Sequence, residues 1–202
     1  MMPLIILEII KNLKIINNMS VFIHPTAIVE TTDIGLNTRI WAFVHVLNDV
    51  KIGENCNICD HCFIENGVSI GDNVTIKSGV NIWTGVAIDD DVHIGPGVVF
   101  TNDKHPRSKQ NFEIGKISIK KGASVGANST LLAGIEIGEY AMTGIGSVVT
   151  KNVKSYALVY GNPAKQQGWI DEEGNKLAKH EEFWISAKGE LYKETETGLM
   201  KI

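Results

Sequence analysis

A large apolar side chain returns at every sixth position along most of this chain. This series consists of Phe22, Ile28, Ile34, Ile40, Val46, Ile52, Ile58, Ile64, Ile70, Ile76, Ile82, Ile88, Ile94 and Phe100. A second series, two residues earlier, is small or β-branched and runs Thr26, Thr32, Thr38, Val44, Val50, Cys56, Cys62, Val68, Val74, Val80, Val86, Val92 and Val98. An α-helix needs a period of 3.6 and a half-buried strand alternates, so neither explains a strict period of six.

Two inward side chains in each unit of six describe a short strand followed by a corner. β-Branched residues suit the strand, and glycine suits a corner where the backbone turns sharply. One such unit cannot bury its own apolar face, but stacked coils bury it together. The pattern therefore predicts an all-β solenoid with its core along the axis.

A second period, of eighteen residues, sets the shape of each coil. Gly35, Gly53 and Gly71 recur at this spacing and are followed at the same step by Asp89. Because eighteen residues are three units, each coil is predicted to be a triangle with three strands. The other two corner columns contain Trp41, Cys59, Lys77 and Gly95, and Leu47, Glu65, Trp83 and Thr101.

The repeat is interrupted once. It resumes after Lys116 with Ile119, Val125, Leu131, Ile137, Thr143 and Val149. The step from Phe100 to Ile119 takes nineteen residues where six would suffice, so about thirteen residues should leave the solenoid as a loop within 101–116. Loops on a rigid scaffold tend to carry function, which makes this segment the first candidate for a site.

The loop leaves from the corner column that holds Glu65 and Trp83. One residue further along, Asn48, Asn66, Thr84 and Asn102 stack on the same edge. The side chains predicted to form one polar patch with an aromatic floor are Glu65, Asn66, Trp83, Thr84, Asn102, Asp103 and His105. The alternative is that the asparagines only form a corner ladder. The neighbouring tryptophan and the histidine-bearing loop favour a site.

Composition narrows the class of protein. The chain is 44% apolar and 21% charged with a formal net charge of −4, as is ordinary for a cytoplasmic protein. It has no cluster of lysines and arginines that would bind nucleic acid. The apolar run from Met2 to Ile10 is too short to span a bilayer, so we expect no membrane partner.

The chain divides into three predicted parts. Residues 1–18 are either an extension upstream of a start at Met19 or a short amphipathic helix that covers the first coil. Residues 19–168 form the β-helix domain. Residues 169–202 form a small tail, for which we expect a hairpin.

Three cysteines, Cys56, Cys59 and Cys62, have the spacing of a metal motif beside His61. Cys56 and Cys62 occupy inward positions one unit apart, so they are predicted on different sides of the triangle, with Cys59 at a corner. We therefore interpret them as small buried hydrophobic residues and expect no metal.

The segment Gly-Asn-Pro-Ala-Lys at 161–165 follows the last coils. Together with the repeat, it resembles the hexapeptide acyltransferases over residues 22–168. The resemblance implies a left-handed parallel β-helix, a homotrimer with active sites between subunits, and acetyl-CoA as co-substrate.

The late coils are the expected place for coenzyme A. Alanine and serine replace valine there and glycines open the corners, so a narrow pantetheine arm could approach the backbone. Lysines near the exit could meet the phosphates. The candidate co-substrate residues are Ala123, Gly126, Ala141, Gly144, Lys151, Asn162, Pro163 and Lys165.

The stretch 67–110, and above all its Phe-Thr-Asn-Asp…Pro-Arg-Ser loop, is similar to nucleotide-sugar 3-N-acetyltransferases. That resemblance implies a dTDP-linked 3-amino-3,6-dideoxyhexose, or less closely a UDP-linked 3-amino uronate, as acceptor in lipopolysaccharide or O-antigen synthesis. Candidate substrate residues are Asn66, Lys77, Trp83, Thr84, Asn102 and Arg107. Some relatives carry paired cysteines in the tail, but residues 171–202 contain none, which excludes a zinc knuckle there.

The acceptor decides which catalytic groups are needed. An amine with a pKa near 8 is about one-tenth deprotonated at neutral pH, whereas an alcohol needs a general base. For amide formation we expect Glu65 or Asp103 to bind the ammonium, with His105 nearby. His105 in its His-Pro context also resembles the catalytic histidine of the galactoside and maltose O-acetyltransferases, so ester formation with His105 as base is the alternative.

Two other classes of protein share this repeat. A γ-type carbonic anhydrase needs a His-x4-His pair, and no two of the six histidines are five residues apart. A non-catalytic scaffold would not need the ejected loop, the small-residue late coils or the 161–165 segment.

Overall fold

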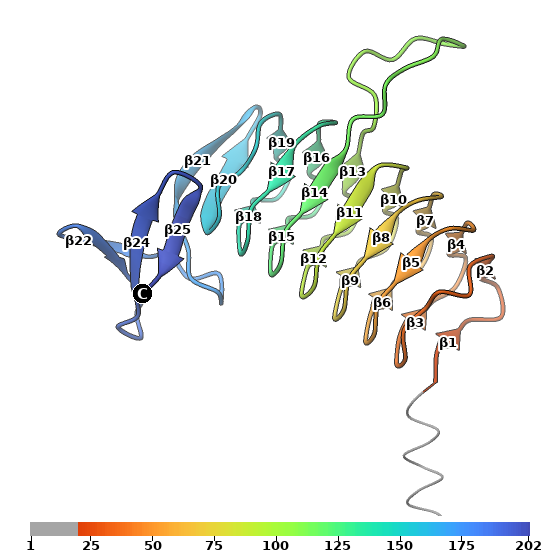
Figure 1. The fold of residues 1–202 in the computed structure, drawn as a ribbon, viewed down its shortest axis with the longest axis horizontal. Coiled ribbons are helices and arrows are strands. Elements are labelled where there is room, and N and C mark those ends of the chain that lie inside the picture. The colour runs from red at the N-terminus through yellow and green to blue at the C-terminus, as the bar shows by residue number, and fades with distance from the viewer. Residues whose placement is uncertain (1–19) are drawn as a thin grey trace, which may run out of the picture.

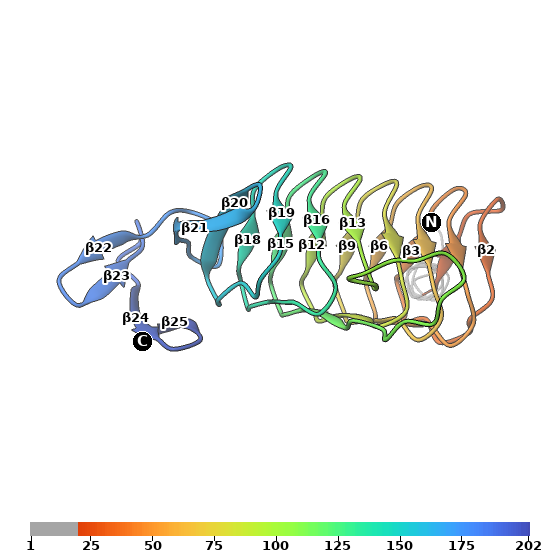
Figure 2. The same ribbon diagram turned by 90° about the horizontal axis from the view of Figure 1, so that it is seen from above.

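The computed structural model describes residues 20–202, and the predicted extension at 1–18 lies outside them. Within residues 20–202 the fold is all-β, and three sheets, parallel except for the end strand β21 (Ala164–Trp169), wrap around one core (Figures 1 and 2). The architecture is a parallel β-helix of three strands per coil, consistent with the left-handed form. No helix that could cross a bilayer occurs in this part of the chain.

The three sheets of the β-helix take one strand from each coil in turn. The first contains β1 (Phe22–Ile23), β3 (Arg39–Ile40), β6 (Asn57–Ile58), β9 (Thr75–Ile76), β12 (His93–Ile94), β15 (Ser124–Val125), β18 (Met142–Thr143), β20 (Ala157–Gly161) and β21 (Ala164–Trp169). The second contains β2 (Ile28–Val29), β4 (His45–Val46), β7 (Phe63–Ile64), β10 (Asn81–Ile82), β13 (Val99–Phe100), β16 (Thr130–Leu131) and β19 (Val148–Val149). The third contains β5 (Lys51–Ile52), β8 (Ser69–Ile70), β11 (Val86–Ile88), β14 (Ile117–Ile119) and β17 (Glu136–Ile137).

The predicted inward column is confirmed from Ile40 onward. Every member of the six-residue series from Ile40 to Phe100 is at most 4% exposed, and the series after the loop from Ile119 to Val149 is at most 2% exposed. The register agrees across the loop, because Ile119 pairs with Ile88 just as Ile88 pairs with Ile70. The loop therefore leaves the stacking of the coils unchanged.

The prediction is wrong in the first coil. Ile23, not Phe22, lies opposite Ile40, and Val29, not Ile28, lies opposite Val46. Ile28 is 58% exposed and Val29 is half-buried, whereas at the open end of the β-helix Phe22 and Ile23 are both exposed, at 39% and 43%. Because side chains alternate along a strand, this shift of one residue exchanges the two faces.

The same shift moves the small inward positions of the first coil. Ala27 packs against the core, whereas Thr26 and Thr32 are exposed. The column regains its period at Ile34, which bridges to Ile52.

Glycine has a different role at the first corner from the one the sequence indicated. A β-carbon on Gly53 would lie 2.6 Å from the carbonyl oxygen of Gly71, so the coils stack too closely for a side chain. The left-handed backbone falls two residues after each glycine, at Asn37, Asn55 and Asn73, with φ between 56° and 61°. Asparagine tolerates this conformation better than most residues, so it forms the turn.

The cysteines lie where the period placed them. Cys56 and Cys62 are buried beside strands of different sheets, and Cys59 is half-buried at a corner. The Sγ atoms of Cys56 and Cys62 donate to the carbonyl oxygens of Gly71 and Lys77. Burial raises the pKa of the Cys62 thiol to about 11, so this thiol is a poor nucleophile.

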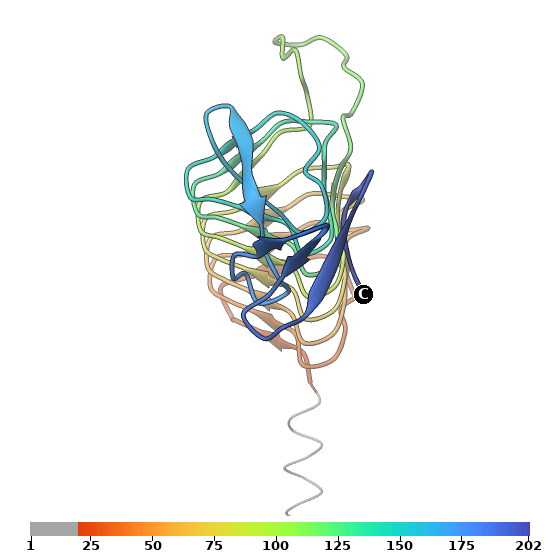
Figure 3. The same ribbon diagram turned by 90° about the vertical axis from the view of Figure 1, so that its left-hand side faces the viewer.

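The tail contains more strands than a hairpin. A fourth, antiparallel sheet consists of β22 (Ala178–His180), β23 (Phe183–Ile185), β24 (Leu191–Thr195) and β25 (Gly198–Lys201). It lies at the C-terminal end of the β-helix, in front of the last coils in Figure 3. The division of the chain into three parts stays a prediction.

Candidate functional site

The ejected loop projects from the β-helix between β13 and β14 (Figure 1). Its base is closed by a hydrogen bond of 2.9 Å from the Gly115 N–H to the Asn102 carbonyl oxygen. Near the base, Asp103 Oδ1 accepts a hydrogen bond of 2.7 Å from the His105 N–H. Asp103 and His105, both predicted for the reaction, are therefore held together.

Residues of the loop line a pocket of about 490 Å³. Its lining residues are Asp103, Lys104, His105, Asn111, Phe112, Glu113, Ile114 and Gly115. Phe112 and Ile114 are 49% and 43% exposed although they are large and apolar. Arg107 lies further out on the loop, where Nη1 donates to the Pro106 carbonyl oxygen.

The coil corner beside the loop orients Glu65. The Thr84 N–H donates to Glu65 Oε2 over 2.7 Å, and Thr84 Oγ1 donates to the Asn66 carbonyl oxygen over 3.0 Å. The Trp83 ring is half-buried, with its centroid 5.6 Å from that of Phe63. Glu65, Asn66, Trp83 and Thr84 thus form one cluster across adjacent coils.

The end of the loop passes over this same corner. A β-carbon on Gly85 would lie 2.6 Å from Ile114 Cγ2, so Gly85 provides the room for the loop to return to β14. At the start of the loop, Thr101 Oγ1 accepts from the Ala133 N–H and donates to the Leu131 carbonyl oxygen. The loop and the Glu65 corner therefore share one edge of the β-helix.

Lys77 does not lie on that edge. It follows β9, at the corner between the first and second sheets, whereas Trp83 follows β10. Its charge acts on His93 of β12, whose pKa is lowered by partial burial and then by Lys77. Within one chain, Lys77 and the loop are therefore on separate corners.

The lowered pKa of His93 has a consequence for stability. As pH falls below the ordinary histidine pKa of about 6.5, the unfolded chain takes up this proton before the folded chain does. The stability that neutral His93 contributes is thus present above about pH 6.5 and lost below it. We expect His93→Gln to reduce the loss of stability between pH 7 and pH 5, measured by urea denaturation. An identical pH dependence in both proteins would contradict this.

The small residues of the late coils have structural roles. Ala123 and Ala141 are fully buried, and their N–H groups donate within corners to Lys120 and Gly138. Their side chains therefore face the core rather than a ligand on the surface.

The late glycines are needed for stacking in their own right. A β-carbon on Gly126 would lie 2.6 Å from the Thr143 carbonyl oxygen, and one on Gly144 would lie 2.7 Å from Tyr160 Cβ. Close stacking of the coils therefore explains the glycines at these two positions, whether or not coenzyme A binds there.

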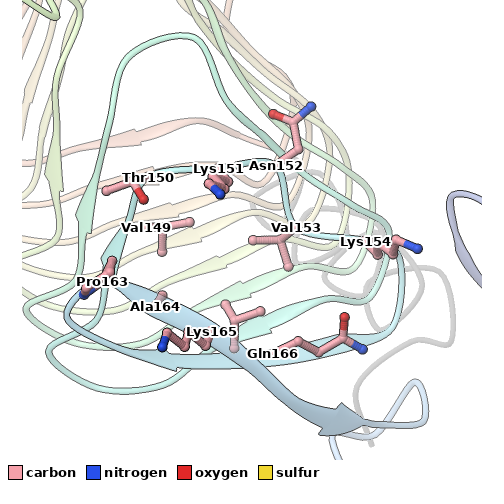
Figure 4. Close-up of a pocket in the computed structure, with 11 residues that line it drawn as sticks. Val149, Thr150, Lys151, Asn152, Val153, Lys154, Pro163, Ala164, Lys165 and Gln166 are labelled. Carbon is pink, nitrogen blue, oxygen red and sulfur yellow. The ribbon is translucent and has the colours of Figure 1, made fainter.

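The end of the β-helix holds a second pocket, of about 380 Å³ (Figure 4). It lies between the final turn at 149–154 and the hairpin of β20 and β21. Its lining residues are Val149, Thr150, Lys151, Asn152, Val153, Lys154, Val159, Pro163, Ala164, Lys165 and Gln166. We call it the end pocket.

The end pocket joins three residues that the sequence analysis proposed, Lys151, Pro163 and Lys165, and Asn162 lies beside them in the hairpin turn. It also adds Lys154, which sequence reasoning missed because a single surface lysine carries no pattern. Three lysines line this pocket, and lysine ammonium groups are cationic donors of the kind that a phosphate ligand requires. The residues present therefore fit the phosphates of coenzyme A.

Comparisons with known proteins agree with this fold. Residues 31–66 and 67–102 match the family model of the bacterial transferase hexapeptide (six repeats), and residues 116–151 match that of the hexapeptide repeat of succinyl-transferase. The gap between the matches coincides with the ejected loop.

Among solved structures, a hexapeptide transferase family protein from Anaplasma phagocytophilum is 25% identical with a TM-score of 0.54, covering 76% of this chain and 81% of that one. A mutant of AntD, an N-acyltransferase from Bacillus cereus in complex with dTDP and coenzyme A, is 20% identical with a TM-score of 0.54. This second likeness covers 81% of this chain and 90% of that one, and it supports the fold alone.

A sequence relative narrows the family. The dTDP-3-amino-3,6-dideoxy-alpha-D-galactopyranose 3-N-acetyltransferase of Aneurinibacillus thermoaerophilus is 58% identical over 173 residues, which are 85% of this chain and 90% of that protein. A relative of this identity over this share of both chains shows the family. The chain is therefore a hexapeptide-repeat acyltransferase that belongs to the nucleotide-sugar N-acetyltransferase family.

Proposed function

We propose that this enzyme transfers the acetyl group of acetyl-CoA to the 3-amino group of a dTDP-linked 3-amino-3,6-dideoxyhexose. The observation that carries the proposal is the 58% identity to an enzyme of that activity over 85% of the chain. The ejected loop and the lysine-lined end pocket support it. The product would serve the synthesis of a surface polysaccharide such as an O-antigen.

The end pocket is the site we assign to the phosphates of acetyl-CoA. Lys151 and Lys154 come from the final turn and Lys165 from β21, so lysines line the pocket on two sides. The co-substrate supplies an activated acyl thioester. The lysines supply charge-assisted hydrogen bonds, which hold that thioester at a fixed distance from the sugar.

The Glu65 corner is the site we assign to the amino sugar. The Thr84 N–H binds Glu65 Oε2, so the carboxylate has a fixed orientation, and its other oxygen is the acceptor that we assign to the sugar ammonium. Asp103, which lines the loop pocket, is a further carboxylate that we assign to this site. Trp83 provides an aromatic surface against which a sugar or base can pack.

The loop supports a homotrimer with sites between subunits. In one chain the apolar side chains of Phe112 and Ile114 are half exposed on a loop that projects from its own β-helix. Contact with a neighbouring subunit would cover them and would bring the loop pocket against a second surface. We place the enzyme in the cytoplasm, where acetyl-CoA and nucleotide sugars are made.

The reaction needs little base catalysis. A sugar amine with a pKa of about 8 is one-tenth neutral at pH 7, and supplying that form costs only about 1.4 kcal/mol. Most of the rate then comes from holding amine and thioester together and from N–H donors to the developing oxyanion. His105 orients the acceptor or takes the proton after attack.

His105→Ala tests this mechanism. We expect kcat/KM for the amino sugar to fall by less than about tenfold, well below the 10²–10⁴ of a general base, and any transfer to the matched hydroxy sugar to be lost. The assay is thiol release from acetyl-CoA, with His180→Ala in the tail as a matched control. Complete loss with both acceptors would show that His105 is an essential base.

A further inference from the structure

The final turn of the β-helix, which provides one wall of the end pocket, is held on its inner side by the preceding coil. The Val153 N–H donates to the Glu136 carbonyl oxygen and the Gly138 N–H donates to the Val153 carbonyl oxygen, both over 2.8 Å. Asn152 Oδ1 accepts from the Glu136 N–H over 3.0 Å. On its outer side, no further coil follows this turn within residues 20–202.

The C-terminal tail takes the place of that next coil. The Ser155 N–H donates to the Thr197 carbonyl oxygen over 3.0 Å, and the Leu199 N–H donates to the Ser155 carbonyl oxygen over 3.1 Å. Ser155 and Gly198 form a parallel bridge, the same arrangement that joins successive coils. Ser155 directly follows Lys154 of the end pocket. We call the contact of residues 197–199 with Ser155 the tail clasp.

The tail clasp requires glycine. A β-carbon on Gly198 would lie 2.6 Å from Ser155 N and closer still to its carbonyl oxygen. On the opposite side, a β-carbon on Gly138 would lie 2.5 Å from the same nitrogen. The Ser155 backbone thus lies in close contact with Gly138 on one side and Gly198 on the other, and a larger side chain fits at neither position. This packing leaves the Ser155 backbone little freedom to move.

The tail itself is anchored to the β-helix. Tyr192 of β24 is fully buried, and its ring meets that of Tyr156 edge-on at 5.4 Å between centroids. Tyr156 in turn stacks on Tyr140 at 5.2 Å. Within the tail itself, Lys201 of β25 forms ion pairs with Glu172 and Glu190. The tail clasp therefore links the final turn to the packed antiparallel sheet of the tail.

We infer that the C-terminal sheet is a positioning element for the co-substrate: residues 197–199, through Ser155, set the wall that carries Lys151 and Lys154. The inference rests on the proposed assignment of the end pocket to acetyl-CoA. Gly198 is accordingly a positioning residue, since it acts through Ser155 and does not touch the ligand. Loss of the clasp would let the wall shift, and charge-assisted hydrogen bonds depend strongly on geometry.

Gly198→Ala tests the inference. Two measurements are made, the Kd of coenzyme A by calorimetry and the hydrogen exchange rate of the Ser155 amide. We expect faster exchange, an increase of roughly tenfold in Kd and in KM for acetyl-CoA, and an unchanged KM for the amino sugar. Gly189→Ala is the matched control, because Gly189, in the turn between β23 and β24, also has positive φ but a β-carbon there meets nothing within 4 Å. It should change neither measurement.

Lys151→Ala separates the two possible failures. If Lys151→Ala raises the Kd of coenzyme A while Gly198→Ala speeds exchange without raising it, the positioning role is wrong and the pocket assignment stands. If Lys151→Ala leaves the Kd unchanged, the pocket assignment itself fails and the inference fails with it. Unchanged Ser155 exchange in Gly198→Ala would show that the tail clasp does not hold the final turn.

Discussion

Replacement of residues 103–114 by two glycines is expected to leave the β-helix folded and to lower kcat/KM by at least about 10³-fold. The coils need no part of the loop, because Ile119 stays in register with Ile88 and the loop base closes at the hydrogen bond from Gly115 to Asn102. The shortened enzyme lacks Asp103 and His105 and the loop pocket. Thiol release measures activity, and circular dichroism with sedimentation measures folding and assembly.

The double variant Ser108→Ala with Gln110→Ala is the control for this experiment, since both side chains are exposed and neither lines the loop pocket. It should retain activity within about threefold, a change of less than 1 kcal/mol in transition-state binding. Retained activity in the shortened enzyme would show that the loop is not part of the active site. Loss of folding would show instead that the coils depend on the loop.

The second large effect is on stability. Ile76→Ala should lower the free energy of unfolding by about 2–5 kcal/mol, because the Ile76 side chain is fully buried in the middle of the inward column. Its neighbours above and below in the sheet are Ile58 and Ile94, which are also fully buried. A cavity at this point cannot be filled by a side chain from outside the coil.

The matched control is Thr75→Ala on the outward side of the same strand β9, for which we expect less than about 1 kcal/mol. Urea denaturation at a fixed protein concentration measures both changes. Equal losses for the two variants would mean that the inward column does not carry the stability of the coils. Neighbouring coils stabilise one another in a repeat protein. The two variants are therefore compared at the main cooperative unfolding transition of the β-helix.

The sequence by itself determined the course of the β-helix from Ile34 onward and the position of its one interruption. It could do so because the coils follow a local rule: in each unit of six, the residue that points to the axis is apolar, with Thr143 as the exception. The rule cannot choose between two adjacent residues that are both apolar. Phe22 and Ile23, and likewise Ile28 and Val29, satisfy it equally, and only pairing with the next coil selected the second of each pair.

The candidate chemistry was predicted in part for the same reason. Glu65, Trp83 and the loop share a corner column that can be counted along the chain, so their proximity follows from the period. The period does not predict the hydrogen bond from the Thr84 N–H that orients Glu65. That bond depends on the distance between two adjacent coils, which the spacing of residues along the chain does not give.

Only the tertiary structure brought Lys154 into the end pocket and placed Gly198 against Ser155. Past the last repeat the chain follows no period, and residues distant in sequence meet through antiparallel strands and a folded tail. Their contacts are decided by packing between surfaces rather than by a spacing that recurs along the chain, so no pattern of single residues could have predicted them.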